Sequence, residues 1–227
     1  LLVNAKADID AQDDNGKTVL MASLFYKSAV CARVLVDARA NVHAVDKHGY
    51  SPLLSAARFH NSYFSRLLID ANANVEVKEP RWGTTPLIMA VQAAARETAQ
   101  LLIRAKANIE ATDNEGNTAL ITAAKRKQTR CVQLLIDNKA NIDAEDKHGR
   151  TAKYWASQKG CLEINVLLAN AGLSSKPQTF TSLPIPPTFK TQAHTILDLM
   201  IYKTNLNCVD NDGNTPLLLA TKHNFLP

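Results

Sequence analysis

The amino-acid sequence predicts an all-α solenoid of stacked helix pairs, and three features that recur along the chain predict it. A turn glycine returns at steps of about 33 residues, with one larger step of 64, at Gly16, Gly49, Gly83, Gly116, Gly149 and Gly213. A hydroxyl residue follows each glycine two positions later, and a small residue follows it seven positions later. A repeat of this length is typical of proteins whose units bury their apolar faces only against neighbouring units.

Residues 113–145 show how one unit is built. The segment DNEG at residues 113–116 is a turn signal, and Thr118 is the predicted N-cap of a short helix that follows. A second helix is predicted after Gln128, because apolar residues recur there near the helical period. These residues are Cys131, Val132, Leu134, Leu135 and Ile136. Two short helices cannot bury these faces alone, so the unit must stack on its copies.

Each copy also predicts where its first helix begins and how closely it packs. The hydroxyl residues are candidate N-caps, and they are Thr18, Ser51, Thr85, Thr118, Thr151 and Thr215. Proline follows three of them, at Pro52, Pro86 and Pro216, where a missing N–H costs no helical hydrogen bond. The small residues, which let neighbouring helices approach closely, are Ser23, Ala56, Ala90, Ala123, Ala156 and Ala220.

The second helix of each copy carries an apolar pair eighteen and nineteen residues after the glycine. The pairs are Val34-Leu35, Leu67-Leu68, Leu101-Leu102, Leu134-Leu135 and Leu167-Leu168. Their constant place in the repeat predicts an apolar core that runs from unit to unit.

Two stretches, DKHGYSPLLSAA at residues 46–57 and PRWGTTPLIMAV at residues 80–91, follow a D-x-x-G-x-T-P-L-x-x-A-A pattern. Two units close with an A-N-(V/I) tripeptide, at residues 73–75 and 107–109. On these residues the chain resembles the ankyrin repeat family, and the resemblance covers almost the whole sequence. It implies an ankyrin repeat solenoid of stacked antiparallel helix pairs with a β-hairpin finger at each turn, which usually binds other proteins.

This pattern predicts a single ankyrin repeat domain over residues 1–227. The expected repeats are 13–45, 46–78, 79–112, 113–145 and 146–173, with partial repeats at 1–12 and 210–227 and a degenerate repeat at 174–209. The degenerate repeat cannot form its first helix normally, because Pro184, Pro186 and Pro187 would each cost about 3 kcal/mol there. Residues 174–188 are therefore expected to form an irregular or polyproline-like insert, either part of a binding surface or the remnant of a decayed repeat. Since the sequence begins inside a repeat, we expect a segment of a longer ankyrin repeat protein.

Three departures from the family pattern carry local predictions. Pro80 stands in place of an aspartate that accepts hydrogen bonds in the family's finger, so this turn is expected to differ. Lys153 stands where other copies have leucine, so packing is expected to weaken there. The glycine with left-handed backbone that the family has after the second helix is also replaced. A residue other than glycine costs roughly 1–2 kcal/mol in that conformation, and a cation at a helix C-terminus regains about 0.3–1 kcal/mol of this. The replacements are Lys6, Arg39, Asn72, Lys106, Lys139 and Lys203.

The sequence carries no convincing signal for catalysis, a cofactor, a metal or a small-molecule substrate. Gly16-Lys17-Thr18 lacks the glycine of a phosphate loop at Ala11, and the apparent calcium loop before Gly213 has Cys208 and Leu219 at ligand positions. No apolar run approaches 18 residues, so membrane insertion is not expected. The four cysteines form no C-x-x-C pair. Cys31 and Cys131 share one repeat position and are interpreted as small buried hydrophobes, which favours an intracellular, cytoplasmic setting.

The family's repeat positions that face its concave groove are mostly basic or aromatic in this chain. The candidate partner-binding residues are Lys47, His48, Tyr50, Arg58, Phe59, Arg81, Trp82, Lys125, Arg126, Lys147, His148 and Arg150, and Phe25-Tyr26 are expected on the same side. Trp82, at a finger tip, is the best candidate anchor, unless it packs against the fingers beside it. With a formal net charge of +5, the chain is predicted to be a scaffold that binds an acidic surface or peptide of a protein partner.

Two other functions stay open at this point. The repeats could be the targeting arm of a longer multidomain enzyme, or part of a host-directed bacterial effector that is delivered into a host cell. The positive charge could also support nucleic-acid binding, but a clear stacking platform and a base-reading helix are missing. Nucleic acid is therefore the less favoured partner.

Overall fold

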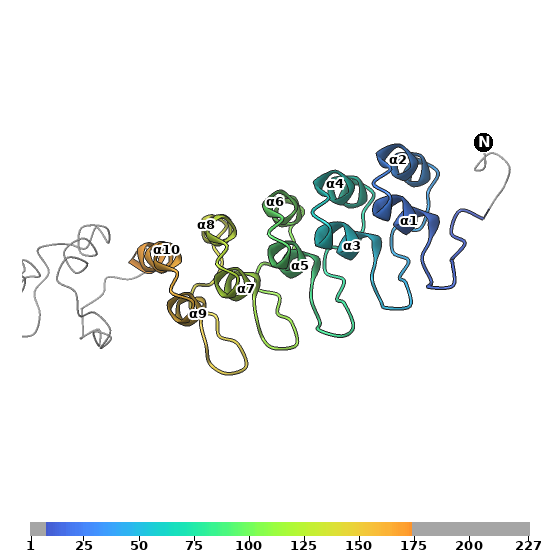
Figure 1. Cartoon of the computed structure of the whole chain (residues 1–227). Coiled ribbons are helices and arrows are strands. Elements are labelled where there is room, and N and C mark those ends of the chain that lie inside the picture. Colours follow the sequence, from blue (N-terminus) through green and yellow to red (C-terminus); the bar gives the residue numbers. More distant parts are fainter. Residues whose placement is uncertain (1–7, 174–227) are drawn as a thin grey trace, which may run out of the picture. The chain divides into compact units, whose positions relative to one another are not determined.

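Ten short α-helices, the first and second helices of the five predicted repeats, lie in residues 8–173, the part of the chain that the computed structural model describes (Figure 1). The first helices of the pairs are α1 (Val19–Phe25), α3 (Pro52–Arg58), α5 (Pro86–Gln92), α7 (Ala119–Lys125) and α9 (Ala152–Gln158). The second helices are α2 (Ala29–Asp37), α4 (Ser62–Asp70), α6 (Arg96–Arg104), α8 (Thr129–Asp137) and α10 (Leu162–Leu173). The chain divides into two units, residues 1–164 and 165–227, and the following description concerns the first.

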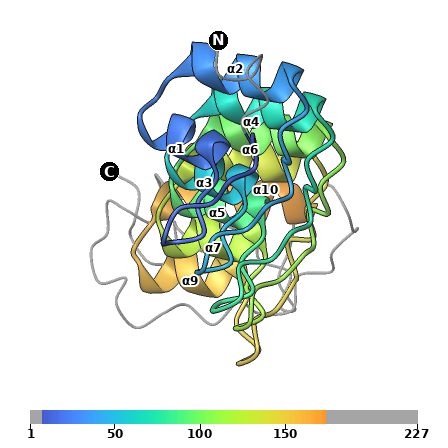
Figure 2. The same ribbon diagram turned by 90° about the vertical axis from the view of Figure 1, so that its right-hand side faces the viewer.

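The helices of residues 8–164 pack in sequential order, as a solenoid requires. Each of α1, α3, α5 and α7 contacts its own second helix and also the first helix of the next pair. The second helices form a parallel series in which α2 contacts α4, α4 contacts α6 and α6 contacts α8. Two layers of helices result, and the loops before the first helices, here called the fingers, project together on one side (Figures 1 and 2). The predicted all-α solenoid of stacked pairs is confirmed.

The predicted caps form in all five described first helices. The hydroxyls of Thr18, Ser51, Thr85, Thr118 and Thr151 each accept a hydrogen bond from the backbone N–H three residues later. Each cap satisfies one of the N–H groups that a helix start leaves without an intrahelical acceptor. Pro52 and Pro86 occupy the first helical turn, as predicted.

The core lies where helices of neighbouring pairs meet. Ala56, Ala90, Ala123 and Ala156 are fully buried, which permits the close approach that small residues predict. In the apolar pairs of the second helices, Leu35, Leu68, Leu102 and Leu135 are buried, whereas Val34 is 50% exposed. The second member of the pair therefore carries the core more consistently than the first. Lys153 is exposed, while Leu20, Leu53, Leu87 and Leu120 at the same repeat position are at most 1% exposed.

The prediction that Cys31 and Cys131 are both buried is wrong for Cys31. Cys131 is 2% exposed, and burial raises the pKa of its thiol, although the charge of Arg96 opposes this rise. Cys31 is exposed. The difference follows from their neighbours, because α8 packs against the preceding second helix α6, whereas α2 is the first such helix in the described residues.

The fingers are tight turns rather than regular β-hairpins in residues 8–173. Their only bridges there are isolated ones, between Gln12 and Thr18 and between Glu145 and Thr151. In a typical finger, the Asp113 N–H donates to the Asn117 carbonyl over 3.1 Å, and the Gly116 N–H donates to the Asp113 carbonyl over 3.0 Å. These two bonds close a turn whose arms are too short to extend into a ladder, so the predicted fingers are present without strands.

Aspartate side chains hold the fingers from inside. Asp113 Oδ1 accepts hydrogen bonds from the Glu115 and Asn117 N–H groups, both at 2.9 Å. At Asp13, equivalent bonds from the Lys17 and Asn15 N–H groups lower the pKa of the carboxyl below its usual value. Such bonds stabilise the ionised carboxylate and fix the turn.

The third finger differs locally, as the proline at position 80 predicts, but another carboxylate replaces the missing aspartate. Glu79 lies one residue before Pro80, and its carboxylate accepts from the Arg81 N–H at 2.9 Å and the Trp82 N–H at 2.7 Å. Glu79 is 3% exposed. The longer side chain thus compensates for the additional residue in this turn, and the finger keeps an internal carboxylate.

Residues other than glycine adopt left-handed backbone at two places in each of the first four full repeats. Arg39, Asn72, Lys106 and Lys139 follow the second helices with φ between 61° and 66°, which confirms this part of the prediction. A second set, which we did not predict, follows the first helices: Lys27, His60, Ala94 and Lys127 have φ between 54° and 58°. Gly160, with φ of 63°, occupies the corresponding place in the fifth repeat.

Carboxylates on the loops after the second helices connect one repeat to the next. Asp10 accepts from the Asn41 N–H over 2.8 Å, and Glu110 accepts from the Asn141 N–H over 2.7 Å. Glu76 likewise accepts from the Asn108 N–H over 2.6 Å. The same position in the first full repeat, residues 13–45, holds His43. In residues 8–173, no hydrogen bond to the Asn74 N–H takes the place of this connection.

Replacing His43 by glutamate is therefore expected to stabilise the protein. A carboxylate at position 43 would accept from the Asn74 N–H as its counterparts do, adding about 0.5–1 kcal/mol to the free energy of unfolding. Urea denaturation followed by circular dichroism measures the gain. His148→Glu makes the same charge change at an exposed finger tip and serves as the control, and an equal gain in both variants would show that charge alone is responsible.

Several predictions fall on residues outside the described range. The segments concerned are residues 1–7 of the first partial repeat, the degenerate repeat with its Pro-rich insert, and the partial repeat at 210–227. The single residues concerned are Lys6, Lys203 and Cys208. In residues 8–173, no helix is both long and apolar enough to cross a membrane.

Candidate protein-binding surface

Two neighbouring hollows lie where the fingers meet the C-terminal ends of the first helices. The first hollow has a volume of about 560 Å³, and six predicted partner-binding residues line it: His48, Tyr50, Arg58, Phe59, Arg81 and Trp82. The second hollow has a volume of about 480 Å³ and is lined by the predicted residues Tyr50, Arg58, Trp82 and Arg126. Half of the predicted set therefore gathers around the first hollow, and Arg126 extends the surface toward α7.

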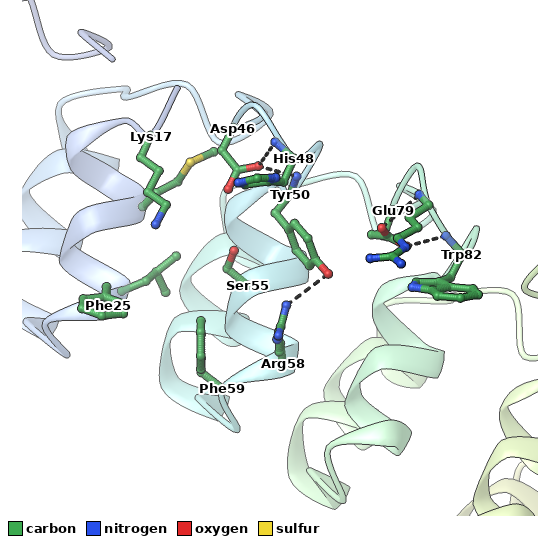
Figure 3. Close-up of a pocket in the computed structure, with 13 residues that line it drawn as sticks. Lys17, Phe25, Asp46, His48, Tyr50, Ser55, Arg58, Phe59, Glu79 and Trp82 are labelled. Carbon is green, nitrogen blue, oxygen red and sulfur yellow. Dashed lines mark hydrogen bonds between the residues drawn. The ribbon is translucent and has the colours of Figure 1, made fainter. Parts of the chain in front are cut away.

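Arg58 and Tyr50 belong to both hollows and are held against each other. The Arg58 Nη1 donates to the Tyr50 hydroxyl over 3.1 Å, and its guanidinium carbon lies 5.4 Å from the centroid of the Tyr50 ring. Figure 3 shows the two side chains pointing toward each other from the finger and the end of α3. This contact fixes the arginine in direction and leaves other guanidinium N–H groups for a ligand.

Trp82 presents an exposed ring on a backbone that is tied to the next finger. Its carbonyl accepts from the Asn114 N–H over 2.8 Å, whereas 53% of the residue remains exposed. The Arg81 guanidinium carbon lies 5.0 Å from the centroid of the indole ring. The backbone of Trp82 thus contacts a neighbouring finger while its ring stays exposed, and its role as a binding anchor stays a prediction.

The part of the first hollow beside α1 and α3 is apolar. Phe25 and Phe59 are 65% and 53% exposed, and Met21 and Leu24 line the same hollow while nearly buried themselves. Lys17 lies above the Phe25 ring, with its Nζ 5.8 Å from the centroid. We did not include Phe25, Met21, Leu24 and Lys17 among the candidate residues, although the aromatic pair at positions 25 and 26 signalled this side of the chain.

Lys125 and Arg150 both lie over the ring of Trp155, a residue that the sequence analysis did not single out. The Lys125 Nζ lies 4.4 Å and the Arg150 guanidinium carbon 4.5 Å from the centroid of the Trp155 ring. Lys125 also donates to Asn117 Oδ1 over 3.1 Å, and Arg150 Nε donates to Asp146 Oδ2 over 2.9 Å. These two cations are engaged within the protein and are less available to a partner.

The remaining candidates are exposed at finger tips. Lys47 and Lys147 donate their backbone N–H groups to Asn15 and Glu115 of the preceding fingers, at 2.9 and 3.0 Å. Lys47, Lys147 and His148 are exposed, as is His48 beside the first hollow. Because the backbone bonds fix the tips while the side chains remain exposed, these positions are accessible from solvent.

The charge of the two hollows is positive because cations outnumber carboxylates in their lining, and the carboxylates are bonded within the fingers. Asp46 Oδ1 accepts from the His48 and Tyr50 N–H groups, both at 2.9 Å. Glu79 uses both oxygens on its own finger, as described above. Lys17, Arg58, Arg81 and Arg126 remain as the cations that face the hollows. This arrangement attracts a negatively charged ligand.

No group of three or more histidine, cysteine, aspartate or glutamate residues in the described range could hold a metal ion. The hollows offer cations, aromatic rings and apolar side chains, which suit recognition of a ligand.

Stacked helix pairs and an open, basic and aromatic surface define a repeat protein of the solenoid class. A family model of ankyrin repeats, spanning three copies, matches residues 1–79, 41–113 and 87–178. These matches cover most of the chain, which therefore belongs to the ankyrin repeat family. Ankyrin repeats generally bind other proteins, and the family is typically non-catalytic. A comparison with curated proteins gives no match.

Proposed function

We propose that this segment is a protein-interaction scaffold, without catalytic activity, that holds an acidic segment of a protein partner against the two hollows and the neighbouring finger tips. The observation that carries the proposal is the group of cations at the hollows, whose neighbouring carboxylates are already bonded to finger N–H groups. A partner carboxylate would thus meet cations that outnumber the carboxylates of the hollows.

The same surface would serve a longer protein. If the repeats are the targeting arm of a multidomain enzyme or of an effector delivered into a host cell, the hollows would bring that protein to its partner. The binding role of the repeats is the same in each case, and an intracellular, cytoplasmic setting fits the free thiols of Cys31, Cys131 and Cys161 in the described residues.

The double variant Arg58→Ala, Arg81→Ala tests the proposed surface. Partner capture from a cell lysate, quantified by mass spectrometry against the unchanged protein, should fall at least about tenfold, because both cations face the first hollow. Arg66→Ala, Arg104→Ala is a matched control, since it removes two arginines from the second helices α4 and α6. Equal losses in both variants would indicate attraction by general charge, and nuclease-sensitive capture would indicate nucleic acid.

Trp82→Ala is expected to weaken partner binding about tenfold or more, while changing the free energy of unfolding by less than about 0.5 kcal/mol. The reason is that the exposed ring forms no buried core, whereas interface anchors are often tryptophan. Tyr63→Ala removes an exposed ring from α4, where Tyr63 is 48% exposed, and should leave binding unchanged. Titration of a captured partner measures both effects, and full affinity in the Trp82 variant would remove Trp82 from the proposed surface.

A further inference from the structure

The surface around the two hollows changes character along the row of helix pairs. The two residues that end each first helix and begin its loop are Phe25-Tyr26, Arg58-Phe59, Gln92-Ala93, Lys125-Arg126 and Gln158-Lys159. Aromatic residues occur in the first two repeats and are replaced by polar, small and basic ones in the later repeats. The exposed rings of Phe25 and Phe59 therefore lie beside α1 and α3, together with the cations Lys17 and Arg58, whereas Arg81 and Arg126 lie beside the third finger and α7.

We propose that the hollows recognise a bipartite acidic segment of a partner protein, with one large apolar side chain at the Phe25–Phe59 end and carboxylates toward Arg81 and Arg126. This inference rests on the proposed function and specifies the partner's chemistry and direction. The exposed rings of Phe25 and Phe59 stand beside the nearly buried Met21 and Leu24, so an apolar side chain would be covered on several sides. Burial of such a side chain is the main gain available at this end.

The arginines supply the second half of the recognition. Arg58 uses its Nη1 on the Tyr50 hydroxyl over 3.1 Å, and Arg81 lies against the Trp82 ring, so both are oriented before a ligand binds. A guanidinium group has five N–H donors, and a carboxylate can accept two of them side by side. Arg126 is exposed and has no side-chain hydrogen bond or ion pair in residues 8–173. A carboxylate that reaches it would meet an unoccupied cation.

The spacing of the repeats sets the length of the recognised segment. Phe59 follows α3 and Arg126 follows α7, and α5 lies between these helices in the packing order. Packed helices lie about 8–10 Å apart, so two steps separate the residues by about 16–20 Å. An extended peptide advances about 3.3 Å a residue, so about five or six residues would connect the apolar anchor to the carboxylate at Arg126.

Two features favour an acidic peptide over a nucleic acid. Beside α1 and α3 the first hollow presents the exposed rings of Phe25 and Phe59, with Lys17 and Arg58 as its cations. A nucleic acid carries phosphates at every step and would place some of them against this apolar end. In addition, Trp155, which could stack on a base, already has Lys125 and Arg150 within 4.5 Å of its ring centroid.

A random peptide library selected against the full chain tests the inference. Enriched peptides should contain one large apolar residue and at least one Asp or Glu about five or six residues away, always in the same order along the peptide. Fluorescence anisotropy then gives the affinity of one enriched peptide, alongside single-stranded DNA as a second probe. A library without an enriched pattern, apolar peptides without acids, or DNA that binds as tightly as the peptide would each overturn the inference.

Paired substitutions locate the two halves. Phe59→Ala should lower the affinity for the selected peptide about tenfold but have little effect on the affinity for a peptide whose apolar residue is alanine. Likewise, Arg126→Ala should lower the affinity for the selected peptide but have little effect on a peptide whose distal acid is replaced. Arg66→Ala, in α4, is the control that should change neither affinity. The proposed direction would be overturned if the effect of Phe59→Ala depended on the acid of the peptide, or if neither variant's effect depended on its peptide residue. If lysate capture still depends on Arg58 and Arg81 in that case, the scaffold function stands and only the bipartite motif is wrong.

Discussion

Replacing Gly116 by alanine is expected to lower the free energy of unfolding by about 3 kcal/mol, whereas Gly160→Ala should cost about 1 kcal/mol or less. Both glycines have left-handed backbone, with φ of 78° and 63°. A Cβ added to Gly116 would lie 2.8 Å from the Lys147 backbone nitrogen. That nitrogen donates to the Glu115 carbonyl over 3.0 Å, so the clash would push apart two bonded fingers.

The Gly160→Ala variant measures the cost of left-handed backbone for alanine without a steric clash. A Cβ at Gly160 would meet nothing within 4 Å, and Ala94 already occupies the same repeat position with φ of 58°. The difference between the two variants therefore measures the contact between neighbouring fingers. Urea denaturation of both variants, followed by circular dichroism, checks the prediction. Equal losses would mean that left-handed backbone alone sets the cost and that the fingers can separate freely.

The regular part of the fold could be predicted because each repeat carries its own determinants. Thr118 caps α7 and Ala123 is fully buried, and the same residue types recur in register in the other copies. Both effects act over a few residues or between adjacent copies, so a repeated sequence reveals them several times. A solenoid also leaves little doubt about topology, since each helix pair packs against the next one in the chain.

The left-handed set after the first helices shows where this reasoning ends. Lys27, His60 and Ala94 have no sequence feature that indicates positive φ, and only Gly160 at the same position could have signalled it. A turn forced by the close packing of two helices can impose this conformation on ordinary residues, and the packing then outweighs the local preference.

The candidate surface was predicted in part for a related reason. Repeat position alone located Arg58 and Trp82, and the equivalent residues Phe25, Gln92 and His48 of neighbouring copies also line the hollows. Position alone could not show that Lys125 and Arg150 are engaged with Trp155, because this depends on side-chain contacts within the fifth repeat and between the fourth and the fifth. The signal available was the size of Trp155, since the same position holds Ala22, Ser55, Met89 and Thr122 in the other copies.

Similarly, Glu79 shows a compensation that the sequence pattern concealed. The proline at position 80 indicated a changed turn, but the replacement acceptor lies one residue earlier and has a longer side chain. Family patterns record which residue occupies a position, whereas the finger requires only a carboxylate that can reach its N–H groups. The same requirement is met in two ways within one chain.

Replacing Asp146 by asparagine is expected to lower the free energy of unfolding by about 3 kcal/mol at neutral pH, more than the same change at Asp46. The tetrapeptide DKHG occurs at both places, so the local sequence is identical. Asp46 accepts only the His48 and Tyr50 backbone N–H groups, both on Oδ1, and an asparagine carbonyl can keep them. Asp46→Asn is therefore the matched control and should cost less than about 1 kcal/mol.

At Asp146 the second carboxylate oxygen has partners that an amide would repel. Oδ2 accepts from Arg150 Nε over 2.9 Å and from the Trp155 indole N–H over 3.1 Å. An asparagine would place its NH₂ group opposite one set of donors and leave them unsatisfied in a residue that is 5% exposed. The loss should also release Arg150 from Trp155, so the near-ultraviolet circular dichroism of the tryptophans should change in Asp146→Asn and stay the same in Asp46→Asn.

The pH dependence of the effect follows from the pKa of Asp146. Desolvation raises this pKa, but the N–H groups of His148 and Arg150, the indole of Trp155 and the side chain of Arg150 outweigh it and lower the pKa from 3.8 to about 2. A lowered folded-state pKa stabilises the protein above the unfolded-state value, and this stabilisation, about 2 kcal/mol, is lost as the pH falls from about 4 toward 2. The difference between the unchanged protein and Asp146→Asn should therefore be constant from pH 7 to pH 5 and shrink near pH 3, and a constant difference down to pH 3 would show that Asp146 is not held ionised by these donors.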